Sequence, residues 1–140
     1  MTKLPILFLL HPVGDGPTRA MNILSTKLWI RALCDAIPDV VVSAPWLPYA
    51  EAMIDRDRGL RDSFAALERH DGAIAVGGEF SRRMLFEWDH AKKLALRCFD
   101  LTRAPLPGIL TYESFAETRT GEFRAQLAGV FRNAMTAEAA

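Results

Sequence analysis

Short hydrophobic runs alternate along the chain with amphipathic stretches, at intervals of roughly 30 residues. The runs have the length of buried strands, and between them apolar residues recur three or four positions apart, as on one face of a helix. This alternation predicts parallel strands joined by right-handed helical crossovers. The expected strands are residues 4–10, 39–44, 72–76 and 96–101, and the expected helices are residues 18–37, 57–70 and 82–94.

The predicted fold class is α/β: a three-layer, flavodoxin-like or Rossmann-like parallel sheet of four or five strands with helices on both faces. The fifth strand is left open, because Pro105, Pro107 and Gly108 leave only residues 109–112 to pair. Residues 45–49 contain two prolines and are predicted to form a loop.

A C-terminal helical tail is expected from about residue 113. Ser114 and Glu117 have the spacing of a capping box, and Gly121 could divide the tail into two helices. Its aromatic residues either cover the sheet or pack against a partner subunit. These residues are Phe115, Phe123 and Phe131.

The composition is that of one folded domain spanning residues 1–140, because a single hydrophobic core organises about 100 to 200 residues. With 17 basic and 17 acidic side chains, the chain lacks the positive field typical of proteins that bind a nucleic acid polymer. The longest apolar run, residues 4–10, is too short to span a membrane, so we expect no membrane partner and a cytoplasmic protein. Cys34 and Cys98 lack metal-site spacing and are predicted to be core thiols.

Three loops follow the carboxyl ends of predicted strands, where open parallel sheets bind their ligands. The first loop, residues 11–17, carries glycines that allow close backbone approach to a phosphate near the start of a helix. The alternative is a plain strand-to-helix turn with Thr18 as the N-cap. The candidate substrate-binding residues of this loop are His11, Gly14, Asp15 and Gly16.

The other two loops also carry candidates. Trp46 and Tyr49 could form a stacking wall for a base, although packing over the sheet is the commoner role of such a pair. The third loop, residues 77–82, contains Gly78 and leads into a helix. We include Trp46 and Gly78 among the candidate substrate-binding residues.

Glu87 is the most informative residue of the sequence. At 100° per residue it falls on the apolar stripe that Met84, Trp88 and Ala91 define. Burying an unpaired carboxylate costs several kcal/mol, so such a residue has a partner, a raised pKa or a chemical task. The structural alternative is an ion pair with Arg82 or Arg83, or a place at the rim of the core.

Two segments resemble the nucleoside 2-deoxyribosyltransferase superfamily: LERHDGAIAVGG at residues 67–78 and SRRMLFEWDHA at residues 81–91. The likeness covers residues 4–102. Within the superfamily, the chain is similar to the branch of hydrolases that cut the N-glycosidic bond of nucleoside 5′-monophosphates. The likeness implies that Glu87 is the nucleophile, that Ser81 accompanies monophosphate cleavage, and that the loop at 11–16 binds the phosphate or sugar end. It also implies a homodimer or higher homo-oligomer and a nucleoside or nucleotide as the small-molecule partner.

The implied chemistry needs a second carboxylate, and here the chain departs from the family. The family's second acid matches Ser63, eight residues before Asp71, with Asp62 one position away. A local shift of the helix could bring in Asp62, our second candidate catalytic residue; Asp15 or Glu79 could substitute; or the site could bind without turnover. The last case predicts a non-catalytic nucleotide-binding or sensor domain, the alternative to an N-glycosidase. Neither a metal nor another cofactor is called for.

Overall fold

A computed structural model of the chain describes residues 3–103 and 106–139, and the side chains of the last helix only as far as residue 133. Its centre is an all-parallel sheet with the strand order β2-β1-β3-β4. The strands are β1 (Ile6–Leu10), β2 (Val41–Ser43), β3 (Gly72–Ala75) and β4 (Arg97–Asp100). The helices are α1 (Gly16–Ala36), α2 (Trp46–Glu51), α3 (Arg56–Leu67), α4 (Arg82–Lys93), α5 (Tyr112–Thr118) and α6 (Gly121–Ala139).

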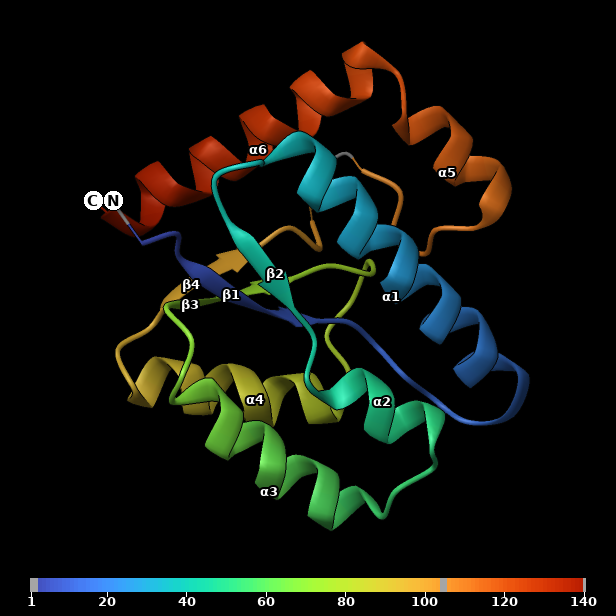
Figure 1. Ribbon diagram of the computed structural model, residues 1–140, viewed down its shortest axis with the longest axis vertical. Helices are drawn as coiled ribbons and strands as arrows, with labels where there is room; N and C mark the ends of the chain where they lie inside the picture. The colour runs from blue at the N-terminus through green and yellow to red at the C-terminus, as the bar shows by residue number, and fades with distance from the viewer. Residues whose placement is uncertain (1–2, 104–105, 140) are drawn as a thin grey trace.

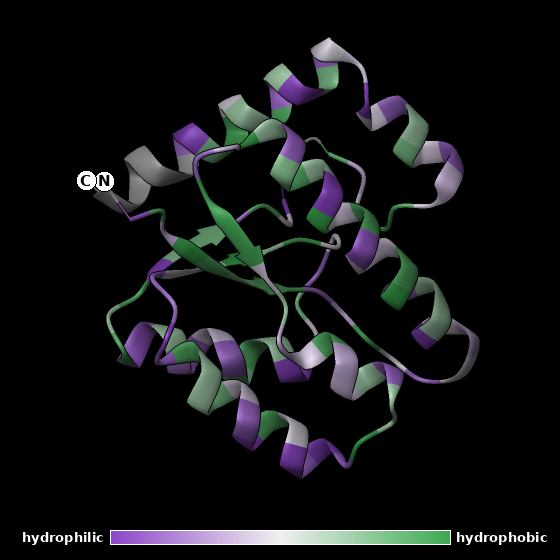
Figure 2. Cartoon of the chain, in the orientation of Figure 1, coloured by the Kyte–Doolittle hydropathy of each residue, from purple (hydrophilic) through white to green (hydrophobic). Residues whose placement is uncertain are grey.

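The sheet lies between two layers of helices (Figure 1). Helices α1, α5 and α6 cover one face, and α2, α3 and α4 cover the other. Alternate strand residues feed two separate cores, as the two-residue repeat of a strand requires. Along β1, Leu7 and Leu9 belong to the first core, whereas Phe8 and Leu10 belong to the second. The apolar character of the strands is visible in Figure 2. The predicted three-layer α/β class is confirmed.

Two predicted elements differ from those observed. The second strand was expected to be buried but is the sheet edge, with only three residues, of which Val41 is exposed. Residues 45–49 were expected to form a loop, but most of them belong to α2. Pro48 does not prevent this helix, because it lies in the first turn, where a backbone N–H has no intrahelical partner.

Several finer predictions also need correction. Helix α1 starts at Gly16 with Asp15 as its N-cap, so Thr18 is already inside the helix. Helix α5 is capped by Thr111, and Ser114 is the residue that returns the capping-box hydrogen bond. Residues 109–111 form no strand. Cys98 is buried as predicted, whereas Cys34 is exposed.

The helical tail packs onto the sheet. Phe115 and Phe131 are buried in the first core, Phe123 packs against it, and the rings of Phe99 and Phe131 lie 5.0 Å apart. Gly121 begins α6, so the tail is divided where the sequence suggested. The segment before the tail is anchored as well, because the Trp29 indole donates a 2.8 Å hydrogen bond to the Gly108 carbonyl. The tail aromatics therefore complete the fold. Pro105 lies outside the described residues.

Candidate functional site

A cavity of about 490 Å³ opens beyond the carboxyl ends of the strands. Its wall consists of the loop after β1, helix α2, and the first turns of α3 and α4. The crossovers that leave β1 and β3 go to opposite faces of the sheet, so the cavity lies at the topological switch point of this strand order. Of the candidate residues, the cavity is lined by Gly14, Asp15, Trp46 and Ser81. Below, this space is called the switch-point cavity.

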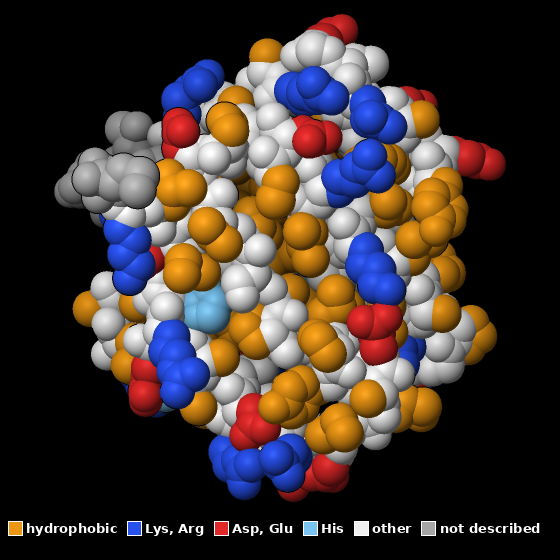
Figure 3. Space-filling view, viewed as in Figure 1, with side chains coloured by type: hydrophobic (Ala, Val, Ile, Leu, Met, Phe, Trp, Pro, Cys, Tyr) orange, Lys and Arg blue, Asp and Glu red, His pale blue; other side chains and the backbone are white. Residues whose placement is uncertain are grey.

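The switch-point cavity is richly charged, although the chain as a whole is neutral. Four arginines line it, together with three aspartates and an apolar wall that includes Phe86. On the face seen in Figure 3, acidic and basic side chains are interspersed. A concentration of guanidinium groups in one concave site favours an anionic ligand. The arginines are Arg19, Arg56, Arg82 and Arg83, and the aspartates are Asp15, Asp55 and Asp57.

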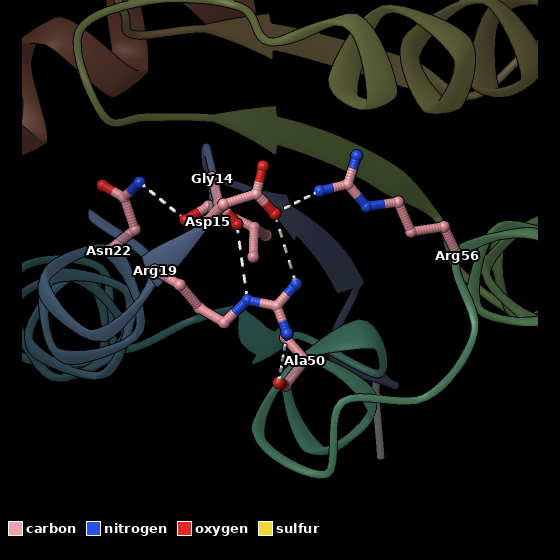
Figure 4. A network of polar contacts seen from close by, with 7 residues as sticks. Gly14, Asp15, Arg19, Asn22, Ala50 and Arg56 are labelled. Carbon is pink, nitrogen blue, oxygen red and sulfur yellow. Dashed lines mark hydrogen bonds and ion pairs between the residues drawn. The ribbon is translucent and has the colours of Figure 1, made fainter. Parts of the chain in front are cut away.

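The glycine loop after β1 is held by side chains of α1 (Figure 4). The Asn22 amide donates a 2.9 Å hydrogen bond to the Val13 carbonyl, and Arg19 Nε donates to the Gly14 carbonyl at 3.3 Å. Gly14 has a φ of +72°, which a residue with a side chain rarely adopts. Gly14 and Asp15 therefore reach the cavity wall, while Gly16 starts α1 and is not among the lining residues.

Asp15 joins this loop to the start of α3. Its carboxylate forms an ion pair with Arg56 and a longer one, 3.8 Å, with Arg19. The side chains of Asp15 and Arg56 are about three-quarters exposed, so the pair contributes only about 0–1 kcal/mol to stability. Because the pair is weak, an anionic ligand in the cavity can compete with the Asp15 carboxylate for Arg56.

His11 is not part of the cavity wall. It is fully buried, its Nδ1 lies 2.7 Å from the Pro12 carbonyl, and its Nε2 lies 2.7 Å from the Ser25 hydroxyl. Because the Leu110 N–H donates to the same hydroxyl, the consistent arrangement is a neutral imidazole that donates from Nδ1 and accepts at Nε2. Burial lowers the pKa of His11 from 6.5 to about 4. His11 therefore ties together β1, α1 and the segment before α5.

Acid should destabilise the fold through His11. The unfolded chain binds a proton near pH 6.5 and the folded chain only near pH 4, so His11's contribution is complete above pH 6.5 and is lost as the pH falls towards 4. We expect a loss of about 3 kcal/mol over this range. Urea unfolding of the wild type and His11→Gln at several pH values measures it, because glutamine does not titrate. If the free energy of unfolding fell equally with pH in the two proteins, His11 would not be the group responsible.

Trp46 and Tyr49 do not form a free stacking wall. Trp46 is 2% exposed, its indole N–H donates to the Leu9 carbonyl at 2.7 Å, and the guanidinium of Arg83 lies 4.7 Å from its ring centroid. The packing alternative therefore holds for Trp46, since its accessible face is covered by an arginine. Tyr49 lines the cavity, and its hydroxyl donates to Asp62 at 2.7 Å.

Glu87 points into the protein, as its place on the apolar stripe of α4 predicted. It is 0% exposed, and Oε1 accepts a 3.3 Å hydrogen bond from Arg83 Nε one turn earlier, so the ion pair with Arg83 that the structural alternative expected is also present. Among the described residues, Oε2 has no hydrogen-bond partner. Burial raises the pKa of Glu87, while the charge of Arg83 and, less strongly, the Ser63 hydroxyl oppose this rise. A largely desolvated carboxylate with one free oxygen is an uncommon arrangement and marks Glu87 as the candidate reactive group.

Asp62 is committed elsewhere. Its carboxylate accepts the Tyr49 hydroxyl and pairs with Arg58 at 3.2 Å and Arg61 at 3.0 Å. The Tyr49 and Arg61 hydrogen bonds lower the pKa of Asp62 to about 2, so it holds no proton at neutral pH. Helix α3 continues through this position and places Ser63 on its buried side. The helix shift that would bring Asp62 into the site is not observed.

Ser81 and Gly78 have structural roles that the sequence did not show. Ser81 caps α4, because its hydroxyl accepts a 3.3 Å hydrogen bond from the Met84 N–H, and it also lines the cavity. Gly78 lies against Gly108: a Cβ on Gly78 would come within 3.3 Å of the Gly108 Cα. Gly78 thus permits a close crossing of two backbones, and it is absent from the cavity wall.

The cavity arginines were the residues that sequence analysis missed. The sequence indicates Arg82 and Arg83 only as partners of Glu87, and it does not single out Arg19 or Arg56. Arginines on amphipathic helices usually lie on a solvated face, so the presence of arginine in these helices does not by itself indicate a binding site. Their positions near the starts of α1, α3 and α4 were the available signal, because helix starts that follow parallel strands face the ligand edge of the sheet.

Fold and site together define a Rossmann-like α/β protein with a charged cavity at its switch point. Comparison of the chain with family models, with curated proteins and with solved structures finds no match. In the described part of the chain, no helix is long and apolar enough to cross a membrane. Residues 3–103 and 106–133 contain no cluster of three or more potential metal ligands.

Proposed function

We propose that this protein is an N-glycosidase or 2-deoxyribosyltransferase that acts on a nucleoside or a nucleoside 5′-monophosphate. The observation that carries the proposal is the buried carboxylate of Glu87, held by an arginine that itself lines the switch-point cavity. The volume of about 490 Å³ is within the range of small-molecule sites, about 300–1,000 Å³. The resemblance of residues 67–91 to the deoxyribosyltransferase superfamily supplies the reaction class.

The reaction proceeds in two displacements at C1′ of the sugar. A Glu87 oxygen forms a bond to C1′ as the bond from C1′ to the base nitrogen breaks, and the electron pair leaves with the base, which takes up a proton. The product is a glycosyl ester of Glu87. Water, or the nitrogen of a second base, then attacks C1′ and gives up its proton to the second carboxylate, the ester bond breaks, and Glu87 leaves as a carboxylate.

A second carboxylate must protonate the departing base. Asp62 is unsuited, because it is ionised and bound to Tyr49 and two arginines. Of the cavity aspartates, Asp15 is paired with Arg56, and Asp55 caps α3 by accepting from the Arg58 N–H. Asp57 has no ion pair or hydrogen bond to the described residues, so it is the carboxylate free to take this role.

A nucleotide-binding domain without turnover is the second candidate. Two observations favour it: the lining of the cavity includes Arg83 but not Glu87, and Asp62 is committed to other partners. In this case the arginines bind the ligand, and Glu87 serves only to orient Arg83.

The first experiment separates these candidates. The protein is incubated with each deoxynucleoside and each deoxynucleoside 5′-monophosphate, and free base is followed by chromatography. We expect release of base from at least one compound. A thermal shift with these ligands but no base release from any of them would contradict the enzymatic proposal and support the binding domain. The absence of both effects would contradict both.

The expectation that the protein assembles into a homodimer or higher homo-oligomer rests on the family resemblance alone. The tail contributes Phe115 and Phe131 to the core of its own subunit. An interface is therefore expected elsewhere on the molecule, and light scattering of the purified protein measures the mass directly.

A further inference from the structure

Arg83 lies between Glu87 and the switch-point cavity. Its guanidinium Nε is 3.3 Å from Glu87 Oε1, its charged group lies over the Trp46 ring at 4.7 Å, and the residue lines the cavity. Glu87 is 0% exposed, whereas the Arg83 side chain is 29% exposed. A ligand that enters the cavity therefore meets Arg83 before it can meet the carboxylate.

The hydrogen bonds of Arg83 are incomplete in this position. Its Nη2 is buried and has no hydrogen-bond partner among the described residues, and Glu87 Oε2 is likewise unpartnered. A buried guanidinium normally satisfies its donors in a bidentate arrangement with a carboxylate or a phosphate. The single contact with Glu87 leaves this donor unsatisfied, and a movement of the guanidinium towards an anion in the cavity would satisfy it.

We propose that Arg83 is a latch over Glu87 that an anionic ligand opens: a phosphate group in the switch-point cavity draws the guanidinium away from the carboxylate and uncovers it. The consequence of this latch for substrate specificity rests on the proposed function. A nucleoside 5′-monophosphate opens its own access to Glu87, whereas a free nucleoside leaves the carboxylate covered. Arg83 is in this sense a positioning residue that determines specificity.

Phosphate opens the latch because it binds the open conformation of Arg83 more tightly than the closed one. A ligand shifts an equilibrium between two conformations only if it binds one of them more tightly. A phosphate gains a charged, bidentate partner only in the open state, in which Arg83 has left Glu87. An uncharged nucleoside gains no such partner. The other cavity arginines, Arg19, Arg56 and Arg82, attract the anion in both states, so they raise affinity without opening the latch.

Nuclear magnetic resonance with inorganic phosphate as the probe tests the latch without any turnover. The side-chain Nε–H of Arg83 and the carboxyl carbon of Glu87 are followed as phosphate is added. We expect both resonances to move with one common midpoint. In Arg83→Ala, the Glu87 carbon should start near its phosphate-bound position and no longer respond. Arg83→Gln replaces the alanine variant if the latter does not fold, because its amide can still donate to Glu87 without attracting phosphate.

Arg82→Ala is the matched control. Arg82 carries the same charge, is adjacent in sequence and lines the same cavity, but its guanidinium lies over the Phe86 ring, 5.8 Å from the centroid, and not on Glu87. This variant should bind phosphate more weakly and still show the joint response of Arg83 and Glu87 at saturation. Phosphate that binds without moving these two resonances, a Glu87 response that persists without Arg83, or no phosphate binding at all would overturn the proposal.

Kinetics then test the consequence for substrate choice. In the wild type, kcat/KM for a monophosphate should exceed that for the same free nucleoside by roughly 100-fold, the size of a strong coupling between two sites. Arg83→Ala should narrow this ratio by accelerating nucleoside cleavage. If the wild type cleaves neither compound while the resonances still move together, the latch stands and the proposed reaction fails. An unchanged ratio in Arg83→Ala would refute the latch alone.

Discussion

Glu87→Gln should lower the rate of base release by at least about a thousandfold while nucleotide binding is retained. The amide has nearly the same shape as the carboxylate but cannot form the glycosyl ester, so only the covalent step is lost. Base release by chromatography gives the rate, and a thermal shift with the same nucleotide reports binding. Glu68→Gln is the control, because Glu68 is an exposed glutamate outside the cavity wall and should leave the rate unchanged.

The same variant should be more stable than the wild type at neutral pH. Burial raises the folded-state pKa of Glu87 above its ordinary value of 4.5, so Glu87 supports folding most when protonated, and this contribution is lost as the pH rises through the raised value. We therefore expect the gain in Glu87→Gln to be absent below pH 4.5 and to grow as the pH rises above it. Thermal unfolding between pH 4 and 8 measures this gain.

The two outcomes bear on different statements. Full activity of Glu87→Gln would exclude Glu87 as the nucleophile, whatever its effect on stability. A loss of stability at neutral pH would show that the ion pair with Arg83 outweighs the cost of burying the carboxylate. Glu68→Gln should change neither the rate nor the stability at neutral pH, because Glu68 is exposed and lies outside the cavity wall.

The frame of the fold could be predicted because two local patterns are explicit in the sequence. The unbroken apolar runs at β1 and β3 and the helical spacing of apolar residues in α1, α3 and α4 identify these elements directly. Glu87 could be predicted for the same reason, since its place on the α4 stripe is a property of one helix. The strand order could not be read from a local pattern, and therefore the edge position of β2 was missed.

The finer geometry of the site depends on contacts between distant segments. The imidazole of His11 is held away from the cavity by its hydrogen bond to the Ser25 hydroxyl of α1, which also accepts the Leu110 N–H. Asp62 is turned towards Tyr49 of α2, a helix that was predicted to be a loop. Neither partner lies within one helical turn of the residue concerned. Loop composition indicated where ligands bind, but not which side chains would reach them.

Gly77→Ala should destabilise the fold by about 4 kcal/mol, a large part of the roughly 5–15 kcal/mol that such a domain has. Gly77 lies two residues after the end of β3 and has a φ of +101°, where a side chain is strained. An added Cβ would lie 2.6 Å from Pro12 Cδ and 3.1 Å from the His11 ring, closer than atoms pack. Because His11 is itself fixed by Ser25, the loop after β1 has little room to yield. Urea unfolding measures the loss of stability.

Gly129→Ala is the comparison that isolates this effect. Gly129 lies within α6, and a Cβ there would meet nothing within 4 Å, so alanine should stabilise the protein by roughly 0.5–1 kcal/mol through its higher helix propensity. The two substitutions are chemically identical and should have opposite signs. A Gly77→Ala protein as stable as the wild type would mean that the loops after β1 and β3 can separate without cost. The packing of Gly77 on Pro12 and His11 would then not be what holds the base of the switch-point cavity together.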